Sequence, residues 1–139
     1  MAGCEALNSY FGDDECQLVI SRLSQTRVLV VLEGRDLGRL GRAPFLELEK
    51  VLALGRPLEL FFDLRSARSA TMDVSGSWAL WLRANSPRLS RVYMLASQPI
   101  IRLSAKAVHG FSELGDKLHL YSDAVAFESA LRAAPLRAL

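Results

Sequence analysis

The sequence predicts an α/β fold: a single domain with a mixed, mostly parallel five-stranded sheet and about four helices, in the order ββαβαβαβα. Three observations predict it. Apolar, β-rich runs alternate with stretches of helical spacing, and only three residues separate the first two of these runs. The 139 residues are 50% hydrophobic but only 8% aromatic, a composition that suits one core built from aliphatic side chains.

The first two strands are expected at residues 16–23 and 27–33. The polar link "SQT" between them is short, which favours an antiparallel hairpin. The second run contains "VLVVL" and is nearly all apolar, as in a strand that is covered on both faces. These two strands therefore begin the sheet.

A first helix is expected from Pro44, because proline fits the first turn of a helix. Phe45 and Leu48 follow at helical spacing, and the glycine and proline of "GRP" after them end the helix. Residues 58–64, "LELFFDL", read as a third, central strand, and residues 65–73 as a polar loop.

The remaining elements continue the alternation of helix and strand. They are expected at residues 74–86 (helix), 91–96 (strand), 98–111 (helix), 117–122 (strand) and 124–134 (helix, capped by Asp123). The domain then spans residues 16–134, between an N-terminal arm at 1–15 and a C-terminal tail at 135–139.

Charge and hydropathy exclude several classes of partner. The 17 basic and 15 acidic residues give a net charge of +2 with no basic stripe, so no nucleic-acid partner is expected. No run approaches eighteen uncharged apolar residues, and the N-terminus lacks a basic region followed by an apolar one. We expect a cytoplasmic protein without a membrane partner.

Catalytic and metal-ligating patterns are also missing from the sequence. Cys4 and Cys16 do not have zinc-site spacing, and reduced thiols are a simpler expectation than a disulfide between them. His109 and His119 have no nucleophile or orienting carboxylate nearby in the sequence. The glycines of "GRDLGRLG" fit neither a P-loop nor a dinucleotide fingerprint. We expect no enzyme activity, no metal and no cofactor.

One corner of the sequence resembles the STAS family, named for sulfate transporters and anti-sigma factor antagonists. The strand end "FFDL" at residues 61–64, "MDVSG" at 72–76 and the apolar "SWALWL" at 77–82 are similar to that family's strand, signature and helix, and "LEGRDL" at 32–37 echoes its second strand. The resemblance covers residues 16–134. It implies a non-enzymatic protein-interaction module in bacterial signalling or regulation.

The partner that the resemblance implies is a kinase-like anti-sigma factor or a multi-protein signalling complex, and a homodimer is also compatible with it. In phosphorylated members of the family the acceptor serine directly follows the aspartate, and Val74 occupies that position here. The standard phosphoserine switch is therefore not expected. Phosphorylation at Ser75 stays open as a hypothesis, as it does at the serines nearby: Ser66, Ser69 and Ser77.

The candidate docking site is the 65–73 loop together with the start of the following helix, as far as residue 77. A helix N-terminus offers free N–H groups to an acidic partner, and a glycine there allows close approach. Arginines on the loop could hold a carboxylate or phosphate. The candidate partner-binding residues are Arg65, Arg68, Asp73, Ser75, Gly76 and Ser77.

Simpler interpretations exist for the same residues. Asp73 and Ser75 could serve only to cap the helix. Trp78 and Trp81 are expected to pack in the core, although an exposed tryptophan there would anchor a partner. The alternative function is a small-ligand-binding domain that uses the carboxyl edge of the sheet, near Asp63 and Arg65 and the loop at Ser97.

Overall fold

The computed structural model describes residues 8–133 of the chain. Its strands are β1 (Asn8–Gly12), β2 (Cys16–Arg22), β3 (Arg27–Asp36), β4 (Leu58–Asp63), β5 (Ala67–Ala70), β6 (Leu89–Leu95) and β7 (Leu118–Tyr121). Its α-helices are α1 (Ala43–Leu52), α2 (Met72–Ala84), α3 (Pro99–Ser112) and α4 (Ala124–Arg132), and short 3₁₀ turns at Ser86–Arg88 and Gly115–Lys117 precede β6 and β7.

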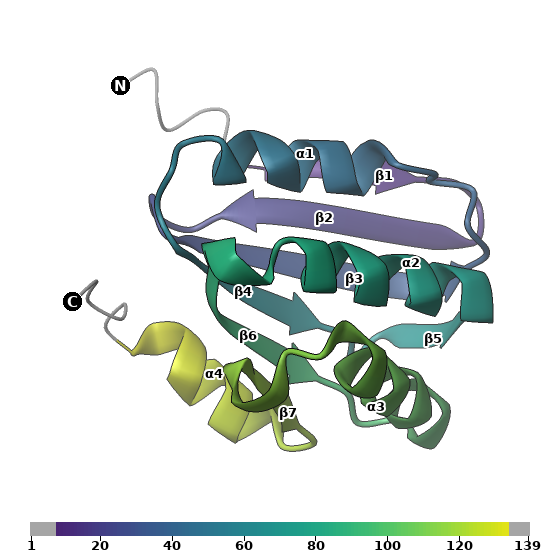
Figure 1. The fold of residues 1–139 in the computed structure, drawn as a ribbon. Helices are drawn as coiled ribbons and strands as arrows, with labels where there is room; N and C mark the ends of the chain where they lie inside the picture. Colours follow the sequence, from purple (N-terminus) through teal and green to yellow (C-terminus); the bar gives the residue numbers. More distant parts are fainter. Residues whose placement is uncertain (1–7, 134–139) are drawn as a thin grey trace.

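The strands form one mixed sheet in the order β1-β2-β3-β4-β6-β7 (Figure 1). β2 is antiparallel to both of its neighbours, β1 and β3, whereas β3, β4, β6 and β7 are parallel. β5 pairs with the end of β3, beyond the point where β4 stops. The antiparallel hairpin at the start and the parallel remainder confirm the predicted fold class.

Helices cover the two faces of the sheet unequally. On one face α1, α2 and α3 lie side by side over the larger core, which includes Leu60 and Phe62 of β4 (Figure 1). On the other face α4 places Phe127 against Phe61 and Leu95 in a smaller cluster. The alternation of Phe61 and Phe62 between the two clusters follows from the two-residue repeat of a strand, and it explains why "LELFFDL" is mostly apolar, with Glu59 and Asp63 as its two charged residues.

A buried ion pair joins the beginning of β3 to β4, and the same arginine reaches α4. The Nε atom of Arg27 lies 2.8 Å from Oε1 of Glu59, and these side chains are only 8% and 3% exposed. The same guanidinium donates to the backbone carbonyls of Ala130, Leu131 and Ala133 at the end of α4, at 3.3, 2.9 and 2.7 Å. Arg27 therefore supplies donors to the last carbonyls of α4, where a helix runs out of its own amides.

The sheet has seven strands, so the prediction of five was wrong. Residues 8–12 of the expected N-terminal arm form β1, which alternates between exposed and half-buried positions and has no apolar run to reveal it. Part of the expected 65–73 loop forms β5, whose four residues include an arginine and a serine. Both strands exist because a neighbouring strand supplies hydrogen-bond partners, which sequence composition does not record.

Cys16 and His119 both lie in the sheet, and neighbouring residues cover them to different extents. Cys16 is a free, buried cysteine, and Cys4 lies outside the described residues. His119 is half-buried, where its ring stacks on Tyr93 and its Nε2 atom accepts a 2.8 Å hydrogen bond from Nη1 of Arg91. The aromatic and basic side chains of β6 therefore hold the imidazole ring in place.

Candidate functional site

The start of α2 lies where β5 ends, and Thr71 is its N-cap. The Oγ1 atom of Thr71 accepts a 3.2 Å hydrogen bond from the amide of Val74, and its carbonyl accepts one from Ser75 at 3.0 Å. The expectation that Asp73 caps the helix was wrong, because α2 begins two residues earlier than predicted and Asp73 occupies its first turn. There its carboxylate still complements the positive end of the helix dipole.

One side of α2 faces solvent and carries large apolar side chains. Met72 is 90% exposed and Leu80 is 65% exposed. Asp73 and Ser77 are also exposed, and a Cβ atom added at Gly76 would meet no atom within 4 Å. We call these five residues the α2 face. It contains three of the residues proposed from the sequence.

Ser75 and Val74 lie away from that face. Ser75 is half-buried and lines a small apolar cavity between α2, α3 and the sheet, together with Ile101 and Ala105 of α3. Val74, at the position of the family's acceptor serine, points toward the β3–α1 loop, where its Cγ2 atom lies 3.6 Å from a Cβ built on Gly38. The helix thus separates Ser75 from the exposed Ser77.

The two candidate arginines differ in their surroundings. Arg65 is held by two carboxylates, Asp63 at 3.0 Å and Glu128 of α4 at 2.9 Å. Hydrogen bonds to Asp63 and then Glu128 raise the pKa of the Arg65 guanidinium above its usual range. Arg68 is exposed on β5, with no ion pair to another residue between 8 and 133. Arg65 therefore links the loop after β4 to α4, and its charge is already balanced.

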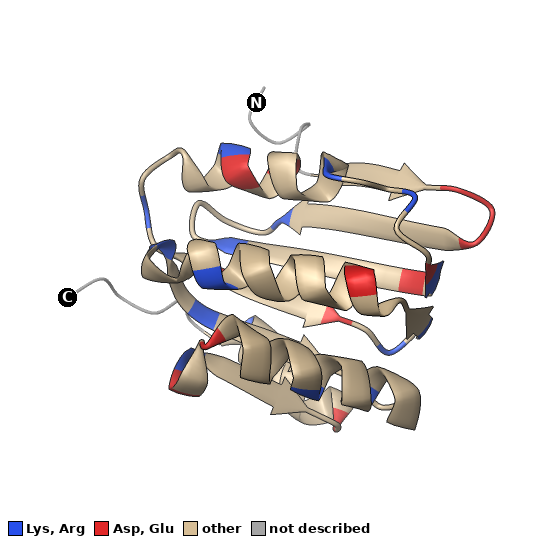
Figure 2. Cartoon of the chain, turned by 45° about the vertical axis from the view of Figure 1, so that its right-hand side comes forward, with Lys and Arg blue, Asp and Glu red and all other residues tan. Residues whose placement is uncertain are grey.

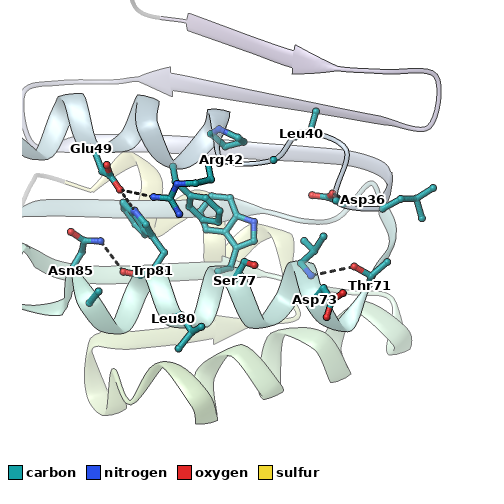
Figure 3. Close-up of a pocket in the computed structure, with 18 residues that line it drawn as sticks. Asp36, Leu40, Arg42, Glu49, Thr71, Asp73, Ser77, Leu80, Trp81 and Asn85 are labelled. Atoms are coloured by element: carbon teal, nitrogen blue, oxygen red, sulfur yellow. Dashed lines mark hydrogen bonds and ion pairs between the residues drawn. The ribbon is translucent and has the colours of Figure 1, made fainter.

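A groove of about 880 Å³ runs between α1 and α2, beside the α2 face (Figure 3). Phe45 and Trp81 are buried beneath it, and Trp78 is half-buried with its ring 4.5 Å from that of Phe45. Trp78 also makes an edge contact with Phe62 of β4, with ring centroids 5.2 Å apart. The expected core packing of both tryptophans is confirmed, and they also form the apolar base of the groove.

Polar groups fix the end of the groove at α1. The indole Nε1 of Trp81 donates a 3.0 Å hydrogen bond to Oε2 of Glu49, and the same oxygen lies 3.6 Å from Nη2 of Arg42 (Figure 3). The guanidinium of Arg42 also lies 5.8 Å from the ring centre of Phe45. Arg42, Glu49 and Trp81 therefore hold one another, and the Arg42–Glu49 pair contributes no net charge to the groove.

Asp36 lies at the other end of the groove, where β3 ends. Its side chain is buried, with the residue 4% exposed, and its Oδ1 atom accepts a 3.0 Å hydrogen bond from the amide of Gly38. Its carbonyl accepts from the amide of Thr71, which ties the end of β3 to the start of α2. Sequence analysis missed Asp36 as a site residue; the only signal was the glycine and acid of "LEGRDL".

Acidic and basic residues both lie at this edge of the sheet. Figure 2 shows acidic residues in the β1–β2 turn, toward the end of β3 and in the first turn of α2, and basic residues at the end of β3, in the β3–α1 loop and on β5. Arg39 of the β3–α1 loop lies 3.8 Å from Asp13 of the turn. In the described part of the chain, no three His, Cys, Asp or Glu side chains are placed to hold a metal ion. None of the helices in residues 8–133 has the length and hydropathy that a membrane crossing demands.

Comparisons with known proteins show the fold. The chain is similar to an uncharacterized DUF3478-family protein with a SpoIIAA-like fold from Shewanella loihica PV-4 (11% identity, TM-score 0.61, covering 87% of this chain and 98% of that one). It is also similar to the anti-sigma factor antagonist SpoIIAA in its unphosphorylated form (13% identity, TM-score 0.59, 85% and 99% covered). A third similar structure is an anti-sigma factor antagonist from Mycobacterium paratuberculosis (19% identity, TM-score 0.53, 88% and 98% covered).

No protein-family model and no curated protein matches the chain. The similar structures are aligned over nearly their whole length, so this chain has a complete SpoIIAA-like fold. The STAS-like domain expected from "FFDL" and "MDVSG" is confirmed at the level of the fold. Two of these three structures are anti-sigma factor antagonists.

Proposed function

We propose that this protein is a non-enzymatic interaction module of STAS type that acts in bacterial signalling or regulation. It binds a protein partner reversibly through the α2 face. Two structures of the same fold belong to anti-sigma factor antagonists, which supports a regulatory role. The partner class is a kinase-like anti-sigma factor or a signalling complex that contains one.

The exposure of Met72 and Leu80 is the single observation that carries this proposal. Two large apolar side chains on one helix face, 90% and 65% exposed, have no role in the core of this domain. Exposed apolar groups that cluster beside polar ones are typical of protein interaction sites. Gly76 lies between them and leaves room for a partner's backbone. The neighbouring helix α3 adds further exposed apolar side chains at Ile100 and Leu103.

Regulation by phosphate at the family's usual position has no acceptor here, because Val74 has no hydroxyl. Ser75 is half-buried toward α3, so a phosphate there would have to displace packed apolar side chains. Ser77 is exposed on the α2 face. A phosphate at Ser77 would add about −1.5 to −2 charges beside Asp73 and would change the surface that the partner meets.

Affinity capture with matched surface variants tests the proposal. The bait is the full chain, as wild type and as Met72→Ser, Leu80→Ser and Val125→Ser, in the cells that produce it. Val125 is the control, since it is 70% exposed on α4, on the other face of the sheet. We expect Met72→Ser and Leu80→Ser each to reduce capture of the main partner about tenfold, the effect of removing an apolar anchor, while Val125→Ser leaves it unchanged.

Circular dichroism checks that all three variants remain folded, which is expected because each replaced side chain is exposed. Equal recovery of the same partner by wild type, Met72→Ser and Leu80→Ser would contradict docking through the α2 face. Failure of the wild-type bait to retain any protein at micromolar concentration would contradict an interaction module altogether.

A further inference from the structure

The groove between α1 and α2 has a chemistry that identifies the kind of side chain it binds. We propose that this groove receives a basic side chain, arginine or lysine, from the partner protein, with the cationic end at Asp36 and Asp73 and the aliphatic stem over the aromatic base. The inference rests on the proposed function, since it names the chemistry of the partner. It also reverses the expectation that this corner attracts an acidic group.

The first step concerns the charges that line the groove. Arg42 and Glu49 form a pair, so they leave no net charge. The carboxylates of Asp36 and Asp73 both line the groove, and neither makes an ion pair with any residue from 8 to 133. The groove therefore carries two carboxylates without a cation, on a chain whose net charge is +2. This local excess attracts a positive group.

Two arginines near this corner have acidic partners, whereas Arg35 and Arg68 are exposed without an ion pair among residues 8–133 and do not line the groove. Arg65 is balanced by Asp63 and Glu128, and Arg39 lies 3.8 Å from Asp13. The N-terminus of α2, to which an anion could have bound, is already capped by Thr71 and complemented by Asp73. An acidic partner would thus meet the carboxylate of Asp73 at this helix start.

The second step concerns Asp36 itself. The residue is only 4% exposed, and its Oδ1 atom accepts a 3.0 Å hydrogen bond from the amide of Gly38. An ionised carboxylate can accept about four hydrogen bonds. A guanidinium or ammonium entering the groove would supply charge-assisted donors, which are stronger than neutral ones.

The third step concerns the path to that carboxylate. Leu40 from the β3–α1 loop and the half-buried Trp78 line the groove between α1 and α2 (Figure 3). Long basic side chains pack their methylene stems on apolar surfaces while the charged end reaches a polar group. A cation that passes over an indole gains further attraction from the ring. The groove combines both features with an acidic end.

Tryptophan fluorescence can report the binding of a basic side chain in the groove. Its only two tryptophans are Trp78 and Trp81, and both line the groove, so intrinsic fluorescence reports on its occupancy. The probes are acetylated, amidated hexapeptides with one arginine between two leucines. Matched peptides carry lysine, the neutral isostere citrulline, or glutamate at that position. Free agmatine separates binding of a small amine from binding of a peptide side chain.

We expect the arginine and lysine peptides to change the fluorescence saturably, and the citrulline peptide to bind about tenfold or more weakly, the factor expected when one charge-assisted hydrogen bond is lost. Asp36→Asn and Asp73→Asn should each weaken the arginine peptide by a similar factor. Asp116→Asn, an exposed acid in the turn before β7, should leave its affinity unchanged. Asp73 is exposed, so its variant tests the proposal even where Asp36→Asn unfolds the protein.

Equal binding of the arginine, citrulline and glutamate peptides would overturn the inference, as would an affinity unchanged by Asp73→Asn or the lack of any saturable response. Saturable binding of agmatine with no response to the peptides would overturn it in favour of a small-amine site. These results are separate from the capture experiment: a partner that depends on Met72 and Leu80 but not on Asp73 would leave the proposed function standing and remove only this groove from it.

Discussion

Replacing Arg27 by methionine should destabilise this protein strongly, because one side chain there serves two elements. Its guanidinium pairs with Glu59 at 2.8 Å and donates to three carbonyls at the end of α4. Methionine keeps much of the aliphatic volume and removes every one of these donors. The variant therefore removes the guanidinium that contacts the carboxylate of Glu59, a side chain that is only 3% exposed.

The magnitude follows from that burial. Removing one partner of a buried ion pair costs about 3–5 kcal/mol, because the remaining charge stays out of water. Domains of this kind have unfolding free energies of about 5–15 kcal/mol, so the loss is a large share of the total. Urea unfolding followed by circular dichroism measures it. Hydrogen exchange should also show faster exchange in α4, whose last carbonyls lose their donors.

A second variant separates charge burial from lost packing. In the double variant Arg27→Met with Glu59→Leu, both members of the buried pair are gone, so the loss should be smaller than the sum of the two single losses by about 2 kcal/mol or more. An Arg27→Met variant within about 1 kcal/mol of wild type would refute this reasoning. Strict additivity of the two single changes would refute it as well.

Three further predictions concern stability. Gly34→Ala should lower the unfolding free energy, measured by urea unfolding, by more than about 1 kcal/mol, because Gly34 has a φ of +85° and the new Cβ would overlap the carbonyl oxygen of Glu15. An unchanged urea midpoint would contradict this prediction. Gly76→Ala should instead stabilise α2 by about 0.5–1 kcal/mol, because no atom lies within 4 Å of the new Cβ. The same variant should weaken capture of the partner. A loss of stability would count against this account of Gly76. Burial, followed by the charge of Asp36, raises the pKa of Cys16 from 9.0 to about 11. The folded protein therefore holds the thiol protonated at a pH where the unfolded chain ionises it. The contribution of Cys16 to the unfolding free energy is complete below pH 9 and is lost as the pH rises toward 11. Between pH 8 and 10 wild type should lose about 1 kcal/mol more unfolding free energy than Cys16→Ala, and parallel pH profiles would show that the thiol does not ionise on unfolding.

The parallel part of the fold could be predicted because its strands are buried on both faces. The run "VLVVL" is apolar throughout and "LELFFDL" is mostly apolar, and helices between them show a buried stripe such as Phe45 and Leu48 of α1. β1 and β5 could not be predicted in the same way. Their side chains are largely exposed or half-buried, and what makes them strands is hydrogen bonding to β2 and to the end of β3.

Only part of the candidate site could be predicted from the sequence, for the same reason. Sequence patterns located the start of α2, and with it Asp73, Gly76 and Ser77. They did not predict that Arg65 would be held by Glu128, a residue 63 positions away in the sequence. Nor did they assign a role to Asp36, which belongs to the site only because β3 ends beside the start of α2.

By itself, the amino-acid sequence determined the class of fold, the alternation of buried strands and helices, and the absence of a hydroxyl at position 74. These properties depend on local composition and periodicity, which can be seen in residues that are close together in the sequence. Only the tertiary structure decided which charges are already paired, which face of α2 is exposed and that α1 and α2 enclose an acidic groove with an aromatic base. Such features depend on residues far apart in the chain, and their free energies are set by burial and distance, which exist only once the sheet and its helices have packed together.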